Sequence, residues 1–122
     1  YFEELKKSAE PDLIFTHRRE DFHQDHRLVS ELTWNTFRDH LILEYEIAKY
    51  DGDLGASNVF VHLDEDVCTA KKRNIVKHFR TQAGNSWFTE DAVLALMRLR
   101  GIESNAASGY AEAFYNRKLV LS

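Results

Sequence analysis

Two histidines and a carboxylate stand close together in the segment His23-Gln24-Asp25-His26. Two imidazoles three residues apart at the start of a predicted helix can point into one cleft. Neutral imidazole is the commonest protein ligand for zinc, and Asp25 can fix the orientation of a ring by accepting its other N–H. An imidazole that binds no metal can act as a general acid or stabilise an oxyanion. The spacing leaves a second interpretation open, in which the side chains are solvated and Asp25 caps the helix.

The loop over residues 16–27, which contains this segment, follows a predicted strand and is rich in ionisable groups. The strand is Leu13-Ile14-Phe15, a continuous apolar run typical of a strand covered on both faces. In open α/β sheets, ligands bind beyond the carboxyl ends of the strands, where loops lead into helix N-termini. The loop is therefore in the position of a ligand site. Its Arg18 and Arg19 either contact an anionic substrate or are solvated.

The remaining patterns predict an α/β fold built on a strand–helix–strand unit. We expect strands at 13–15, 41–45 and 110–121 and helices over 2–9, 25–39, from Asp64 to about 81, and from Thr89 to near Gly101. Apolar side chains are expected to form one face of the second helix (Leu28, Val29, Leu32 and Phe37) and to face inward from the third (Val67, Ile75, Val76 and Phe79).

The small number of strands leaves an apolar parallel strand short of neighbours. A strand such as Leu13-Ile14-Phe15 normally lies inside a sheet and is hydrogen-bonded on both sides. With so few other strands, at least one edge of the sheet is expected to be open, and open apolar edges pair with other chains. We therefore expect an oligomer, or a chain that aggregates or lacks its natural neighbour.

The composition fits one small domain and excludes some classes of protein. The 122 residues are 43% hydrophobic and 30% charged, with a net charge of −4 and scattered Lys and Arg. A nucleic-acid surface would need a basic face, so we expect no nucleic-acid partner. No apolar run approaches the roughly 20 residues that cross a bilayer, so we expect no membrane partner. The single cysteine, Cys68, is expected to be buried and inert and suits a reducing cytoplasm.

Three parts of the sequence carry a resemblance to a known family. Residues 12–17, Asp-Leu-Ile-Phe-Thr-His, together with His23-Gln24-Asp25-His26, resemble the strand and H-x-D-H loop of the PIG-L/LmbE zinc-dependent N-deacetylases. The run 110–114, Tyr-Ala-Glu-Ala-Phe, resembles their closing Y-A-E-x-F strand, and segments 31–39 and 87–91 are similar to one bacterial branch. The resemblance implies a single domain over residues 1–122, a partial Rossmann-like three-layer sandwich that lacks its N-terminal strands.

The resemblance also implies a role for each residue of the loop. His26 matches the third zinc ligand of the family. His23 matches the imidazole that stabilises the tetrahedral oxyanion or protonates the leaving amine, and Asp25 matches the carboxylate that orients it. The family's reaction is attack of zinc-activated water on the acetyl carbonyl of an N-acetylglucosamine-like amide. The implied partner is an amino-sugar or nucleotide-sugar substrate, with no substrate-binding residue assigned.

The sequence departs from the family in lacking the N-terminal P-H-P-D-D-E segment. That segment supplies the other two zinc ligands and the general base, and its strand would neighbour Leu13-Ile14-Phe15. A single protein ligand does not hold zinc, so we expect the chain alone to be inactive and to need the segment from a longer protein or a complementing chain. The alternative is a non-catalytic, self-associating remnant of a deacetylase that acts as a small interaction or structural protein. Glu112 either faces the site or pairs locally.

Overall fold

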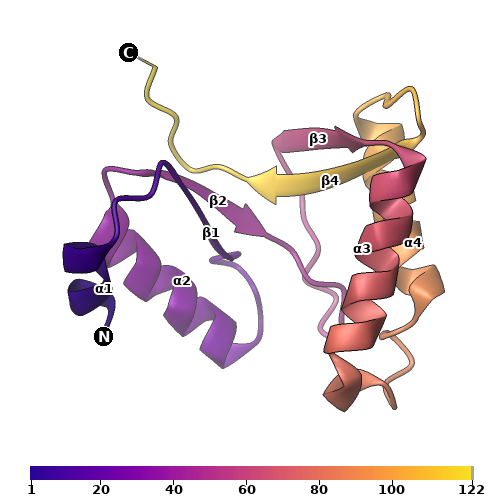
Figure 1. Ribbon diagram of the computed structural model, residues 1–122, viewed down its shortest axis with the longest axis horizontal. Helices are drawn as coiled ribbons and strands as arrows, with labels where there is room; N and C mark the ends of the chain where they lie inside the picture. Colours follow the sequence, from indigo (N-terminus) through magenta and orange to yellow (C-terminus); the bar gives the residue numbers. More distant parts are fainter. Residues whose placement is uncertain (122) are drawn as a thin grey trace. The chain divides into compact units, whose positions relative to one another are not determined.

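The computed structural model describes residues 1–121 and has a mixed α/β fold with a four-stranded mixed sheet. The elements in chain order are α1 (Phe2–Ser8), β1 (Leu13–His17), α2 (Gln24–Phe37), β2 (Leu41–Tyr45), β3 (Val59–Leu63), α3 (Glu65–His78), the 3₁₀ turn η1 (Arg80–Gln82), α4 (Glu90–Glu103) and β4 (Tyr110–Tyr115) (Figure 1). The strand order is β1-β2-β4-β3, with β1 and β2 parallel and β2 and β4 antiparallel. The predicted α/β class is confirmed.

The chain divides into two compact units, and each is described by itself. The first contains Tyr1–Glu46, Asp53–Val59 and the end of the chain from Phe114, and the second contains Ile47–Gly52 and Phe60–Ala113. None of the helices over residues 1–121 is long and apolar enough to pass through a membrane. The prediction of one deacetylase-like domain over residues 1–122 stays a prediction.

The first unit is built on the predicted strand–helix–strand arrangement. β1 and β2 pair in parallel register from Leu13 opposite Leu41 to His17 opposite Tyr45, and α2 lies along these strands (Figure 1). The predicted strand at 41–45 coincides with β2, and the helix predicted over 25–39 is α2. The last predicted strand was too long, because β4 ends at Tyr115.

β1 lies at one edge of the sheet, so the prediction of an open edge is confirmed. The prediction that its apolar run is covered on both faces is wrong. Thr16 is buried and faces α2, where its hydroxyl lies 3.0 Å from that of Thr33. Side chains alternate along a strand, and Leu13 and Phe15 on the opposite face are 39% and 53% exposed. The apolar run therefore leaves one face partly open to solvent.

The buried face of α2 differs from the predicted one. Phe37 is buried, but Leu28 and Leu32 are 55% and 37% exposed. Ser30, Thr33 and Phe37 recur at helical spacing on the buried side. Two of these three side chains are small, which lets the helix lie close to the sheet. The predicted apolar face was wrong because small hydroxyl residues, rather than the leucines, contact the strands.

The second unit has its core where α3 and α4 pack together (Figure 1). Its buried residues include Leu63, Cys68 and Met97. Cys68 is buried as predicted, and burial raises the pKa of its thiol. Val67 and Phe79 were predicted to face inward but are 46% and 57% exposed. Cys68, next to Val67 in the chain, occupies the inward position instead.

Both helices of the second unit begin at the predicted caps, whereas α4 continues past its predicted end. The side chain of Asp64 accepts the N–H of Val67, and that of Thr89 accepts the N–H of Ala92. Gly101 lies inside α4. Another segment of backbone packs against the helix at this position, and only a residue without a side chain leaves room for it. A Cβ at Gly101 would lie 2.1 Å from the carbonyl oxygen of Gly109.

The end of α4 is set by a Schellman motif after Gly101. Asn105 adopts a left-handed conformation with φ of 52°. The N–H of Ala106 donates to the carbonyl of Gly101 at 2.9 Å, and the N–H of Asn105 donates to that of Ile102 at 3.2 Å. These two bonds satisfy carbonyls that the helix end would otherwise leave without partners. Asn105 therefore supplies the left-handed residue that ends many helices and is more often glycine.

Candidate functional site

The carboxyl ends of β1 and β2 bring the first two side chains of the candidate site together. His17 ends β1, Tyr45 ends β2, and the two residues are partners in the parallel register. The Tyr45 hydroxyl lies 3.1 Å from Nε2 of His17. Burial, with a smaller contribution from the charge of Asp21, raises the pKa of Tyr45. The phenol therefore stays protonated at neutral pH and can donate to the imidazole.

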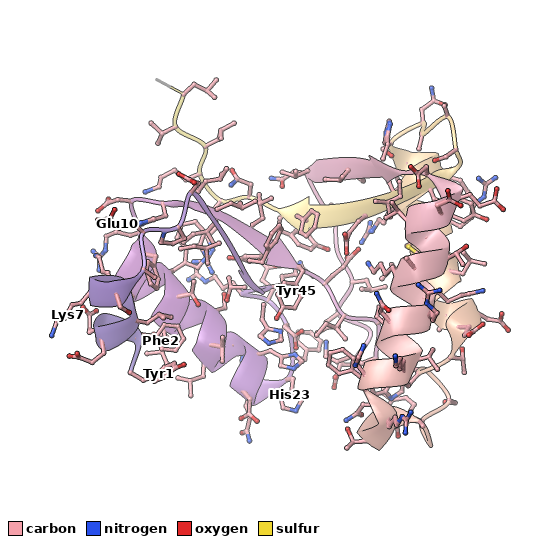
Figure 2. The ribbon with its side chains drawn as sticks, in the orientation of Figure 1. Tyr1, Phe2, Lys7, Glu10, His23 and Tyr45 are labelled. Carbon is pink, nitrogen blue, oxygen red and sulfur yellow. The ribbon has the colours of Figure 1, made fainter. Side chains whose placement is uncertain are left out.

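Three imidazoles stack at this end of the sheet. The rings of His17 and His26 are nearly parallel, with centroids 4.0 Å apart, and those of His23 and His26 are 4.5 Å apart. Figure 2 shows His23 at the N-terminal end of α2 and Tyr45 at the end of β2. The structure thus brings the two predicted site histidines together and adds His17, for which the sequence left open either a place in the cleft or a role as a polar strand end.

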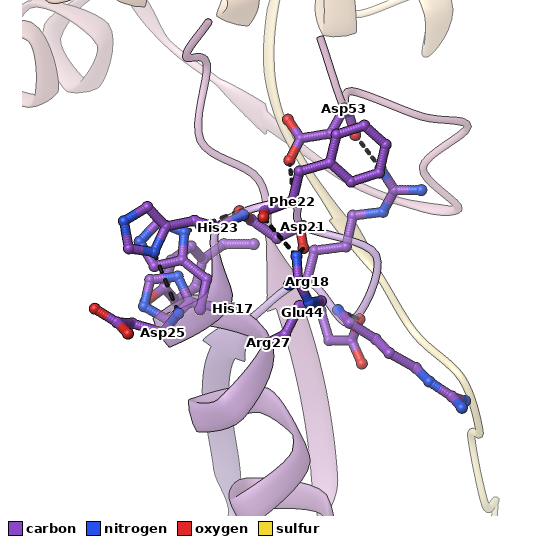
Figure 3. A network of polar contacts seen from close by, with 12 residues as sticks. His17, Arg18, Asp21, Phe22, His23, Asp25, Arg27, Glu44 and Asp53 are labelled. Carbon is purple, nitrogen blue, oxygen red and sulfur yellow. Dashed lines mark hydrogen bonds and ion pairs between the residues drawn. The ribbon is translucent and has the colours of Figure 1, made fainter. Parts of the chain in front are cut away.

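Asp21 contacts both predicted histidines, and Figure 3 shows it beside His23. Its side chain is only 3% exposed, and its Oδ2 lies 3.0 Å from Nδ1 of His26. Its Oδ1 accepts the backbone N–H of His23 at 2.8 Å. Histidines that bind metals commonly donate their second ring N–H to a carboxylate. Asp21 is in that relation to His26, and Nε2 of His26 makes no hydrogen bond to residues 1–121.

The sequence analysis missed Asp21 and selected Asp25 instead. The signal for Asp21 was a carboxylate five residues before a candidate ligand, which is uninformative unless the loop conformation is known. The Asp25 carboxylate is directed away from Asp21 in Figure 3. It makes no hydrogen bond or ion pair with the part of the chain that the structure describes. The orienting role of Asp25 stays a prediction.

The helix cap is His23, not Asp25 as the alternative interpretation proposed. His23 is the residue before α2, and its Nδ1 accepts the backbone N–H of Asp25 at 3.3 Å. Because Nδ1 is the acceptor, the neutral ring carries its proton on Nε2. Nε2 has no partner within residues 1–121 and is available as a donor.

Asp53, in the segment between β2 and β3, fixes the loop that contains the histidines. The Asp53 carboxylate accepts the N–H of Phe22 at 2.7 Å, and the Asp53 carbonyl accepts a hydrogen bond from Arg18. Arg27 donates to the carbonyl oxygens of Asp21, at 3.0 Å, and of Phe22. These bonds position the backbone of the loop, so the imidazoles are presented by an ordered segment.

The described residues supply one candidate metal ligand, His26, with a carboxylate beside it, and they do not form a complete zinc site. Within residues 1–121, no three His, Cys, Asp or Glu side chains are arranged to hold a metal ion. Zinc takes three or four ligands. His26 with Asp21 fits one corner of such a site.

Glu112, whose role was left open, pairs locally. Its carboxylate forms an ion pair with Lys71 within the second unit. The structure thus answers the question left by the sequence in favour of local pairing.

No protein-family model matches the chain, and no curated protein matches it significantly. The resemblance to the PIG-L/LmbE deacetylases therefore stays a prediction from the motifs quoted above.

Proposed function

We propose that the chain forms the C-terminal region of a zinc-dependent hydrolase that removes an N-acetyl group from an amino-sugar substrate. The observation that carries the proposal is the contact between Asp21 and Nδ1 of His26, which leaves Nε2 of His26 available to a ligand. A partial Rossmann-like sandwich is part of the same proposal and is supported by the parallel pairing of β1 and β2 around α2. A cytoplasmic location is proposed from the single cysteine.

In this proposal the two histidines have different roles. His26 is a zinc ligand through Nε2, and Asp21 positions its ring by accepting the Nδ1 proton. His23 carries its proton on Nε2, because its Nδ1 accepts the N–H of Asp25. That proton can be donated to the carbonyl oxygen as negative charge develops on it, or to the leaving amine. When bound, zinc would supply activated water and polarise the acetyl carbonyl.

The proposal requires two further zinc ligands and a general base from outside residues 1–122. β1 is an edge strand, so a strand that carries these groups can pair with its open side. A parallel neighbour would bring its carboxyl end beside His17, where the loop of β1 begins. The open edge thus supports the proposal that a P-H-P-D-D-E segment completes the site.

The test is complementation of the chain by such a segment. The chain alone is expected to bind less than stoichiometric zinc and to leave N-acetylglucosamine derivatives intact. The chain fused to, or mixed with, a strand bearing P-H-P-D-D-E is expected to bind one zinc and release acetate. His26→Ala is expected to abolish both gains, and His78→Ala, on the exposed end of α3, is the matched control. Enzyme-like hydrolysis by the chain alone would contradict the proposal.

The alternative is a self-associating protein without catalysis, and the exposed apolar side chains of the first unit favour it. Leu13 and Phe15, on the same face of β1, are 39% and 53% exposed. Exposed apolar groups promote association when they form a patch. Sedimentation with and without a chelator distinguishes the two functions. A tight homodimer that ignores zinc and gains no activity on complementation would support the alternative.

A further inference from the structure

A second polar site is lined in part by the loop that carries the histidines, but it includes none of the histidines themselves. A pocket of about 390 Å³ opens within the first unit. Its lining includes Arg18, Arg19, Glu44, Asn58, Tyr115 and Arg117. Three arginines and two carboxylates, those of Glu20 and Glu44, line the pocket, so its formal charge is +1. The pocket is therefore positively charged, although the chain as a whole has a net charge of −4.

Glu44 is the buried anchor of the pocket. Its side chain is 3% exposed, and it forms an ion pair with Nε of Arg117. It also accepts the backbone N–H of Arg19 at 2.8 Å and the indole N–H of Trp34 at 2.7 Å. The Arg117 guanidinium stacks over the Trp34 ring at 4.4 Å. The charge of Glu44 is therefore used to hold the frame of the pocket and does not compete for a ligand.

Arg18 is held in a slot made by an aromatic ring and a glycine. Its guanidinium lies 4.2 Å from the centre of the Tyr115 ring. A Cβ at Gly55 would lie 2.5 Å from Nη2 of Arg18, so a larger residue there would make the end of the Arg18 side chain shift. Nη2 also pairs with Glu20 at 2.6 Å, but the Glu20 side chain is 75% exposed. An exposed ion pair of this kind contributes little stability, so an incoming anion can replace Glu20.

Arg19 places a positively charged guanidinium at the pocket. Its backbone is fixed by Glu44, whereas its guanidinium makes no hydrogen bond or ion pair with the residues that the structure describes. Guanidinium groups bind phosphate and carboxylate oxygens in a bidentate manner. We propose that this pocket binds an oxyanion, a phosphate or carboxylate group, with Arg19 as the principal ligand and Arg18 as the second. This binding requires no zinc and goes beyond the proposed deacetylase function.

The test is titration of the metal-free, 122-residue chain with inorganic phosphate, followed by calorimetry and by backbone amide shifts of residues 19, 58 and 116. Saturable binding at these amides is expected. Arg19→Ala should weaken it about tenfold or more, since charge-assisted hydrogen bonds are the strong ones. Arg73→Ala is the control, because Arg73 is an exposed arginine of α3 in the second unit. Its affinity should equal that of the unchanged chain.

Glu20→Gln is expected to change the phosphate affinity in the opposite direction. The Glu20 side chain is exposed and is not needed for folding. Removal of the competing carboxylate should tighten phosphate binding severalfold. N-acetylglucosamine 6-phosphate, acetate and neutral N-acetylglucosamine identify the source of the anion. A sugar phosphate that binds more tightly than inorganic phosphate places the anion on a sugar, and preference for acetate places it on a carboxylate. No saturable shift, or equal weakening by Arg19→Ala and Arg73→Ala, would overturn the proposal.

Discussion

Asp21 and His26 form a pair in which a buried carboxylate oxygen lies 3.0 Å from a ring nitrogen that does not face the proposed ligand position. The same carboxylate accepts the N–H of His23 through its other oxygen. One side chain therefore sets both the ring orientation of His26 and the backbone position of His23. The pair links the loop conformation to the chemistry proposed for it.

Asp21→Asn is expected to loosen this arrangement. The amide is uncharged and is a poorer acceptor for the Nδ1 proton, so zinc affinity of the complemented protein should fall about 10–100-fold. In the chain alone, nitrogen NMR should show the Nδ1-protonated form of His26, and Asp21→Asn should reduce it. Asp25→Asn is the comparison, because its carboxylate does not contact His26. A larger effect of Asp25→Asn than of Asp21→Asn would contradict the positioning of His26 by Asp21.

Gly101→Ala is expected to destabilise the second unit. The new Cβ would lie 2.1 Å from the carbonyl oxygen of Gly109, and this neighbour is backbone that cannot rotate away. Overpacking of this kind costs about 1–3 kcal/mol or more. Urea denaturation measures the free energy of unfolding. Gly84→Ala is the matched control, since a Cβ there meets nothing within 4 Å. Equal stability of the two variants would show that α4 and Gly109 are not in contact.

Local patterns in the sequence predicted the elements of the fold well. The apolar run at residues 13–15 marked β1, and Asp64 and Thr89 marked the starts of α3 and α4, because each signal acts within one turn or one strand. β3 was not among the predicted strands. Its burial does not alternate regularly, with Val59 and Phe60 half-buried and Val61 and His62 exposed. A short strand without alternation gives no clear periodic signal.

The sequence did not predict the parts of the site that depend on contacts between distant residues. The segment His23 to His26 was found because its residue types and spacing suit metal binding. Asp21 gained its role from a loop conformation that Asp53, more than 30 residues away, holds in place. His17 joined the stack because β1 and β2 end in register. Neither relation can be inferred from spacing along the chain.

Leu32→Ser should have a small effect on folding compared with Phe37→Ala. Leu32 is 37% exposed, whereas Phe37 is 4% exposed. A buried phenylalanine loses about 3–5 kcal/mol on truncation to alanine, and a surface change typically costs within about 0.5 kcal/mol. Denaturation curves of both variants test which face of α2 meets the sheet. A larger loss from Leu32→Ser would mean that the leucines are buried, as the sequence analysis expected.

Burial of the Tyr45 phenol makes the stability of the folded protein depend on pH in the alkaline range. Burial raises the pKa of Tyr45 above 10.0 in the folded chain, with a smaller contribution from Asp21. A raised pKa means that the folded state holds the phenol proton more tightly than the unfolded state. This contribution to stability is complete below pH about 10 and is lost as the pH rises above it. The pKa values of Tyr115 and Cys68 are raised as well, so the unchanged chain should lose stability in the same direction.

Tyr45→Phe separates the part that belongs to Tyr45. At neutral pH the variant should be less stable by about 0.5–1.5 kcal/mol, because the hydrogen bond to His17 is lost. Above pH about 10 its free energy of unfolding should fall less steeply than that of the unchanged chain. Tyr1→Phe is the control, since Tyr1 is 94% exposed. Parallel curves for Tyr45→Phe and the unchanged chain would show that the phenol has the same pKa in the folded and unfolded states, which would contradict the effect expected from its burial.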